Sequence, residues 1–175
     1  MTIRKFEEFM PEVAETAFVD EAAMVIGNVK LGADSSVWPM CSVRGDINSI
    51  SIGERTNIQD GSILHVTHDS KYAPGGAKLS VGDDVTVGHN VVLHACTIEN
   101  ECLIGMGAVV LDKAVVQCGV MVGAGSLVPP GKILESGYLW LGSPVKRVRE
   151  LSEKEKSFFK YSAQHYVKLK NRHKI

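Results

Sequence analysis

Three histidines, His65, His89 and His94, are the residues of this chain best suited to chemistry. His65 and His94 each follow an aliphatic residue at a place where neighbouring segments carry glycine. Neutral imidazoles bind zinc at about 2.0–2.1 Å, and a site with three of them leaves a fourth position open to water. Zinc lowers the pKa of that water to about 7, so that hydroxide is available at neutral pH. The three histidines therefore predict a catalytic metal site rather than a structural one.

Four polar residues near these histidines in the sequence predict the rest of the site. Gln59 is suited to orient a zinc-bound hydroxide through a hydrogen bond, and Asp60 or Asp46 is suited to hold an imidazole or the Arg44 guanidinium. Such a site would attack a small electrophilic carbonyl carbon. The alternative is that these charges form a structural ion-pair network at an interface. Imidazoles also accept iron and cobalt, so zinc is the expected metal but not the only candidate.

An aliphatic residue recurs at intervals of six and indicates which elements position the histidines. Eleven of the fourteen steps are six residues long, and the three exceptional gaps begin with Arg44, His65 and His94. The second place of many hexads holds glycine, where a backbone must bend or approach a neighbour closely. The repeat is therefore a scaffold that is interrupted where the polar residues cluster. Its aliphatic positions are Leu31, Val37, Val43, Ile52, Ile58, Leu64, Val81, Val87, Leu93, Ile98, Ile104, Val110, Val116, Val122 and Val128.

Hexads of this kind predict short strands joined by tight turns. Three strands make one triangular coil of about eighteen residues, and coils stack as a parallel β-solenoid with the aliphatic residues inside. We expect this all-β domain, with its N-terminal lead-in, over residues 1–150. An ordinary β-sandwich is the alternative, and eleven steps in phase make it the weaker one. Cys41 and Cys102 occupy a place in the hexad that takes small residues, so we expect them to pack inside as free thiols.

Counting hexads places the histidines on two different sides of the prism. Arg44, His65 and His94 stack on one side on coils about 4.8 Å apart, so the two imidazoles can lean toward one zinc ion. His89 comes directly after a strand on another side of the prism, one coil above Asp60, and a turn separates it from His94. We therefore expect a neighbouring chain to supply the third imidazole. A head-to-tail contact of this kind closes only as a ring, so the prism predicts a homotrimer with Arg44 near Asp60 across the contact.

The segment after the repeat predicts a helix. Pro129-Pro130-Gly131 interrupts the hexads, and Ser152-Glu153-Lys154-Glu155 has the pattern of a capping box that opens a C-terminal helix over residues 151–175. An apolar stripe at helical spacing predicts that this helix packs on the prism or on another subunit. We expect the basic stretch 168–174 to be a solvated helix terminus, and a patch for an anionic surface is the alternative.

Composition argues against several classes of function. A net charge of −1 with 45% hydrophobic residues argues against disorder and against binding of nucleic acid. No apolar run approaches the eighteen residues of a membrane span, so no membrane association is expected. The first eight residues carry acids and no apolar run, which predicts no secretory signal. The four cysteines have no CxxC spacing, and a cytoplasmic location is the default expectation.

The strings that carry the site residues resemble those of γ-class carbonic anhydrases, and the resemblance covers nearly the whole chain. It implies a left-handed β-helix, a homotrimer and three interfacial metal ions held by ligands matching His65, His89 and His94. The matching strings are Val43-Arg44-Gly45-Asp46, Asn57-Ile58-Gln59-Asp60-Gly61, His65, Gly88-His89-Asn90-Val91-Val92-Leu93-His94 and Ser136-Gly137-Tyr138-Leu139-Trp140-Leu141-Gly142-Ser143-Pro144.

The resemblance also implies roles for the other polar residues. Gln59 matches a glutamine that contacts the reacting water. Tyr138 matches a tyrosine that lines the site. Arg44, Asp46 and Asp60 match positions at the interface and behind the ligands. The implied reaction is reversible hydration of carbon dioxide to bicarbonate by zinc-bound hydroxide.

One departure from the family bears on turnover. The archaeal type member carries a loop whose glutamate moves protons out of the site, and the comparable stretch 66–78 has no glutamate. His68 or Asp69 is the candidate substitute, and we expect hydration to be slow without a good proton carrier. Two other functions stay open. One is a hexapeptide acyltransferase or thioester hydrolase, and the other is a trimeric metal-binding protein without turnover.

Overall fold

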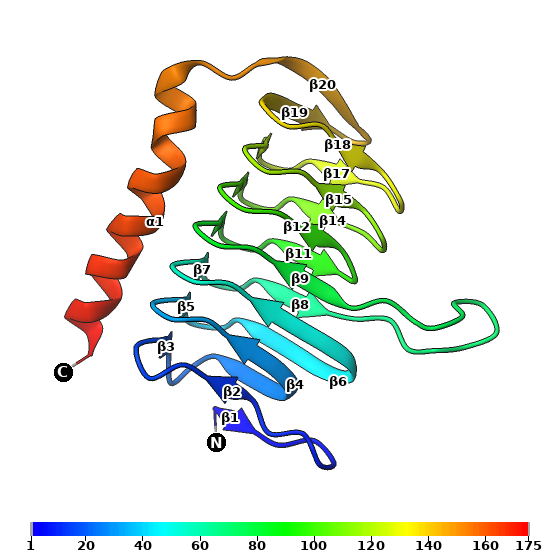
Figure 1. Ribbon diagram of the computed structural model, residues 1–175, viewed down its shortest axis with the longest axis vertical. Coiled ribbons are helices and arrows are strands. Elements are labelled where there is room, and N and C mark those ends of the chain that lie inside the picture. The colour runs from blue at the N-terminus through cyan, green and yellow to red at the C-terminus, as the bar shows by residue number, and fades with distance from the viewer. Residues whose placement is uncertain (1, 175) are drawn as a thin grey trace.

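The computed structural model describes residues 2–174 and shows short strands stacked in parallel, coil upon coil (Figure 1). The aliphatic positions of the repeat pair as the period predicts. Val43 pairs with Leu64, Leu64 pairs with Leu93, and on another side Ile58 pairs with Val87. The predicted fold class, a left-handed parallel β-helix with a C-terminal α-helix, is confirmed.

One side of the prism, here called side A, is an eight-stranded sheet that is parallel except for its last pair. Its strands are β3 (Phe18–Val19), β5 (Ser36–Val37), β7 (Asn57–Ile58), β10 (Thr86–Val87), β13 (Leu103–Ile104), β16 (Met121–Val122), β19 (Tyr138–Gly142) and β20 (Val145–Glu150).

The other two sides form one twelve-stranded sheet, because two long strands, β4 (Met24–Leu31) and β6 (Ser42–Ile52), belong to both. Side B contains the first half of β6, then β8 (Ile63–His65), β11 (Val92–His94), β14 (Val109–Val110) and β17 (Leu127–Val128). Side C contains the second half of β6, then β9 (Leu79–Val81), β12 (Thr97–Ile98), β15 (Val115–Val116) and β18 (Ile133–Leu134). The lead-in strands β1 (Ile3–Arg4) and β2 (Glu12–Val13) pair with β4.

The interior is a column of aliphatic side chains. Ile58, Leu64 and Leu93 are 0% exposed, so each coil contributes fully buried apolar surface, the main favourable term in folding. Cys41 and Cys102 are buried in the same column and are free thiols, as predicted. Burial raises the pKa of Cys41 to about 11 and that of Cys102 to about 12, so both thiols are protonated and unreactive at neutral pH.

The three breaks in the period have separate structural causes. The first lies inside β6, which continues around a corner as one strand with a register shift instead of a turn. The second is the loop 66–78 between β8 and β9, which projects from the prism (Figure 1). The third is a five-residue step between β11 and β12, which turns at Ala95 with a φ of 47°. Two of these breaks directly follow His65 and His94.

Helix α1 (Glu153–His173) begins at the predicted capping box, in which the Ser152 hydroxyl accepts from the backbone of Glu155 and the Glu155 carboxylate accepts from the backbone of Ser152. The helix runs back along the prism, so that the C-terminal end lies near the first coils (Figure 1). It packs on side A through buried Phe159 and Ala163, and the Ser162 and Thr86 hydroxyl oxygens lie 2.8 Å apart. Within the described residues, no helix has the length and hydrophobicity that a membrane crossing needs.

The end of α1 differs from the expectation of a solvated basic terminus. The Lys170 side chain is only 1% exposed. Its ammonium group donates to the Thr16 carbonyl and the Asn171 side chain, both at 2.8 Å, and lies 3.0 Å from an Asp34 carboxylate oxygen. These partners replace the water that the charge loses on burial. Lys170 therefore attaches the helix terminus to the first coils instead of facing solvent.

Candidate metal centre

His65 and His94 form the predicted column on side B. They end β8 and β11, and the parallel register pairs one directly with the other. The Nδ1 atom of His65 lies 3.3 Å from the Nε2 atom of His94, with the ring centroids 5.3 Å apart. The parallel ladder thus brings two imidazoles from positions 29 residues apart to a common point.

A carboxylate holds the far nitrogen of each ring. Asp46 Oδ1 lies 3.1 Å from His65 Nε2, and Asp112 Oδ2 lies 2.8 Å from His94 Nδ1. A neutral imidazole has one N–H group, and an ionised carboxylate only accepts. In its neutral form, each ring therefore donates its single proton to its carboxylate. The lone pairs of His65 Nδ1 and His94 Nε2 then face each other with no proton between them.

Two facing lone pairs repel, and a cation between them would remove the repulsion. In a tetrahedral site with bonds of about 2.0–2.1 Å, neighbouring ligand nitrogens are about 3.3–3.4 Å apart. The observed separation of 3.3 Å agrees with that spacing. Carboxylates behind the ligands are also the usual companions of metal-bound histidines, because they select the tautomer and orient the ring. These residues fit a divalent metal ion.

Burial and hydrogen bonding shift the pKa values of His65 and of the two carboxylates behind the pair. Burial lowers the pKa of His65 below its ordinary value, and the charge of Arg44 adds to this effect while the Asp46 hydrogen bond opposes it. Burial works to raise the pKa of Asp46, but hydrogen bonds from Arg44 and His65 bring it below its ordinary value. The pKa of Asp112 is lowered in the same way by its hydrogen-bonded neighbours. Neutral imidazole backed by charged carboxylate is the state that metal binding requires.

We expect the metal-free protein to lose stability as the pH falls below neutral. The pKa of folded His65 is below 6.5, so the unfolded chain takes up the proton first and the free energy of unfolding declines below about pH 6.5. Asp46 and Asp112 contribute stability above about pH 3.8, which is lost as the pH falls through their lower folded values. Urea unfolding in chelator from about pH 7.5 to 3 measures the decline. The His65→Gln chain should decline less between pH 7 and 5, and an equal decline would contradict this assignment.

His89 lies on a different side, as predicted, in the turn that follows β10 on side A. Its Nδ1 atom is 3.0 Å from Asp60 Oδ2, so its Nε2 atom is the nitrogen left for a ligand. Among residues 2–174, no three histidine, cysteine or acidic side chains of one chain are arranged so that they could hold a metal ion. Supply of the third imidazole by a neighbouring chain remains a prediction.

The orientation of the Gln59 amide follows from a short chain of hydrogen bonds. The Asn57 Nδ2 group lies 3.4 Å from the Val85 carbonyl and 3.2 Å from Thr86 Oγ1, so Asn57 Oδ1 is left as an acceptor. Gln59 Nε2 donates to that oxygen at 3.0 Å. Gln59 is 5% exposed, and its remaining polar atom is Oε1. The glutamine therefore offers an acceptor, which is suited to a hydroxyl or water proton.

A cavity of about 250 Å³ opens beside Gln59 and His89, between side A and α1. Phe158 and Tyr166 of the helix line it together with Leu103 of the sheet. One water molecule occupies about 30 Å³ in the liquid. The cavity is therefore several times larger than a molecule of three atoms, such as water, requires. Gln59 and His89 thus lie at the edge of a largely apolar cavity.

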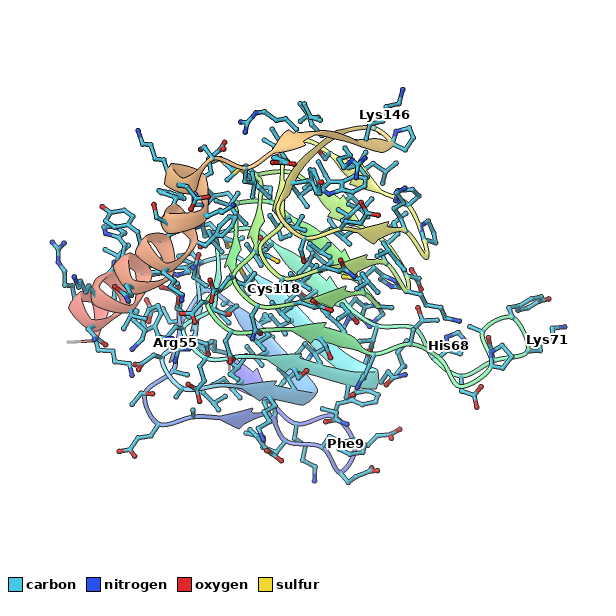
Figure 2. All side chains as sticks on the ribbon, turned by 45° about the horizontal axis from the view of Figure 1, so that its top comes forward. Phe9, Arg55, His68, Lys71, Cys118 and Lys146 are labelled. Atoms are coloured by element: carbon cyan, nitrogen blue, oxygen red, sulfur yellow. The ribbon has the colours of Figure 1, made fainter. Side chains whose placement is uncertain are left out.

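Of the other predicted residues, Arg44 lies behind the pair, whereas Tyr138 and His68 lie elsewhere. Arg44 forms an ion pair with Asp46 of its own chain, and its predicted contact with Asp60 of a neighbour stays a prediction. Tyr138 is on β19, three ladder steps beyond β10, where the Arg147 guanidinium lies 4.7 Å from its ring centroid. Steps of about 4.8 Å separate Tyr138 from the level of His89 by about 14 Å. The chain therefore does not bring Tyr138 to the histidines. Figure 2 shows His68 on the projecting loop.

Two residues at the site were not predicted for it. Asp112 follows His94 by 18 residues, one full coil, and that spacing is the signal that would have identified it. Tyr166, on the C-terminal helix, lines the cavity with Gln59 and His89, and its position depends on how α1 docks. Tyr166 is therefore the tyrosine that the structure places near these two residues.

Comparison with known proteins identifies relatives over nearly the full chain. Protein YrdA of Escherichia coli strain K12 is 53% identical over 169 residues, which cover 97% of this chain and 92% of that protein. The mitochondrial gamma carbonic anhydrase 1 of Arabidopsis thaliana is 44% identical over 163 residues, 93% of this chain. The matched region spans 59% of the plant protein's length.

A solved structure supports the same grouping. A hexapeptide transferase family protein from Anaplasma phagocytophilum superposes with a TM-score of 0.89 at 38% identity, covering 98% of this chain and 96% of that one. No family model matches the sequence. From these identities and the shared parallel β-helix, the chain belongs to the γ-carbonic anhydrase-like family of hexapeptide-repeat proteins.

Proposed function

We propose that this protein is a metal-dependent γ-class carbonic anhydrase that interconverts carbon dioxide and bicarbonate as a homotrimer. The observation that carries the proposal is the His65–His94 pair, whose Nδ1 and Nε2 atoms face each other at 3.3 Å while Asp46 and Asp112 contact the far nitrogens. These two residues and His89 of a neighbouring chain would hold zinc, with iron or cobalt as alternatives. The identity to a plant γ carbonic anhydrase supports the activity.

Several residues of this chain would have separate roles in the reaction. When bound, zinc would supply a water whose pKa is about 7. Gln59 Oε1 is the free acceptor of its amide, and it would accept a hydrogen bond from the reacting water and so orient that water toward the substrate carbon. Asp46, Asp60 and Asp112 keep each imidazole in the tautomer that leaves one nitrogen free for the metal. The apolar cavity beside Gln59 and His89 provides room for a small uncharged substrate.

Proton removal is the step for which this chain is least well equipped. Loop 66–78 carries His68 and Asp69 where the archaeal type member carries a glutamate. Asp69 Oδ1 already accepts from the Gly75 backbone at 2.8 Å, which leaves His68 as the more available proton carrier. Turnover should therefore rise with the concentration of an external buffer.

Acyl transfer or thioester hydrolysis is the second candidate. It is favoured by a cavity larger than carbon dioxide requires and by the transferase name of the Anaplasma structure. It assigns no role to the His65–His94 pair and the carboxylates behind it, so we rank it second. A trimeric metal-binding protein without turnover would use the pair but not Gln59.

Stopped-flow measurement of carbon dioxide hydration by the zinc-loaded protein tests the proposal. We expect hydration above the buffer rate, a loss of about 10–100-fold in Gln59→Leu and complete loss in His89→Ala. Gln164→Leu, on the exposed face of α1, is the matched control and should retain wild-type activity. Zinc-loaded protein that hydrolyses thioesters but does not hydrate carbon dioxide would support the second candidate. Loaded protein that does neither would support the third.

A further inference from the structure

We propose that Thr67 and Asp112 are positioning residues for His94 and that they connect the root of the projecting loop to the metal centre. The inference rests on the proposed function for its effect on metal affinity. The orientation of His94 that it predicts is a property of the metal-free chain.

Asp112 is held at both carboxylate oxygens. Oδ2 accepts from His94 Nδ1 at 2.8 Å, and Oδ1 accepts from the Thr67 hydroxyl in a short hydrogen bond. Because each oxygen has its own donor, the carboxylate cannot turn without breaking one of them. The Thr67 hydroxyl thus fixes the plane of the group that fixes the His94 ring.

Thr67 is itself anchored at the point where the loop leaves the prism. Its backbone N–H donates to the Ala77 carbonyl at 3.0 Å, and its carbonyl accepts from Ala77 N–H at 2.9 Å and from Asn48 Nδ2 at 3.2 Å. Loop 66–78 is therefore closed at its base by a two-way backbone bridge. The residue that forms this bridge also points its hydroxyl at Asp112.

The two imidazoles of the pair are supported in the same way, each by a carboxylate with a second partner. Asp46 contacts the far nitrogen of His65 through one oxygen and the Arg44 guanidinium through the other. Asp112 contacts the far nitrogen of His94 through one oxygen and the Thr67 hydroxyl through the other. One carboxylate is thus held by a cation on β6 and the other by a hydroxyl on the loop. The geometry of His94 then depends on the closed base of the loop.

The first test is the tautomer of His94 in metal-free protein at about pH 8, measured from ring ¹⁵N shifts and assigned by comparison with His94→Gln. Wild type should show His94 protonated at Nδ1. Asp112→Asn should shift it toward the Nε2-protonated form, and Thr67→Val should give a mixture. Thr67→Ser, which keeps the hydroxyl, should restore the wild-type signal. Thr97→Val is the matched control, because the Thr97 hydroxyl on β12 makes no hydrogen bond among residues 2–174.

The second test is the zinc dissociation constant of the same variants, measured by competition with a chromogenic chelator. We expect affinity to fall about 10–100-fold in Asp112→Asn and by a smaller factor in Thr67→Val, with no change in Thr67→Ser or Thr97→Val. An unchanged tautomer in both Asp112→Asn and Thr67→Val would overturn the inference. A tautomer that shifts as expected in a protein that never binds zinc would overturn the proposed function and leave the positioning intact.

Discussion

Chains carrying His89→Ala and chains carrying His65→Ala should each lose their metal, and co-refolded equal mixtures of the two should regain about a quarter of the sites. In the proposed homotrimer, a site needs His65 and His94 from one chain and His89 from the next. In a randomly assembled ring, half of the chains at each position can supply the pair and half can supply the single imidazole, so about one contact in four is complete. Metal analysis of the mixture, after removal of free zinc, measures this fraction.

A second mixture provides the control for this experiment. His65→Ala and His94→Ala both damage the paired ligands, so no contact in their mixture has an intact pair and no metal should return. In both mixtures every chain has the same scaffold and lacks one imidazole. Recovery in neither mixture would contradict the division of ligands between chains. Equal recovery in both would place the metal on a different set of residues.

Gly105→Ala should destabilise the protein by about 3 kcal/mol, the upper part of the range for overpacking. A Cβ at this position would lie 2.5 Å from Ala124 N and 2.7 Å from both Gly123 C and Val122 O. All three atoms are backbone of the next coil, so no side chain can move aside. The coils would have to separate locally, which would break ladder hydrogen bonds. Urea unfolding of the metal-free protein measures the loss.

Gly107→Ala is the matched control for this clash. A Cβ there meets nothing within 4 Å, but the backbone has a φ of +68°, which costs an L-residue about 1–2 kcal/mol. The two substitutions add the same methyl group two residues apart and separate crowding from backbone strain. If Gly107→Ala proves as costly as Gly105→Ala, close approach between coils is not the reason for glycine at position 105.

Much of the site's location follows from the period of six. Counting in steps of six places His65 one coil above Arg44 and places His94 one coil above His65. The reason is that each coil returns the chain to the same side of the prism. The same count puts His89 on another side above Asp60, and the structure has both arrangements. The capping box at Ser152 likewise predicts the start of α1 from local hydrogen bonding alone.

Other features depend on which side chains meet after folding. Tyr166 reaches the cavity through the docking of α1 on side A, whereas Tyr138 lies three ladder steps away. Lys170 is buried because the helix end meets Thr16 and Asp34 of the first coils. A helical spacing shows which residues share a face, but it does not show what that face will contact.

The coil, the core and the sides on which the three histidines lie follow from the amino-acid sequence, because a constant period sets the direction of every side chain in a regular ladder. Three features require the folded chain: the contact of Asp112 with His94, the orientation of the Gln59 amide, and the choice of which imidazole nitrogens face each other. These last features are set by rotamers and by competition among hydrogen-bond donors, and both are decided by contacts between segments that the spacing of residues along a chain does not record.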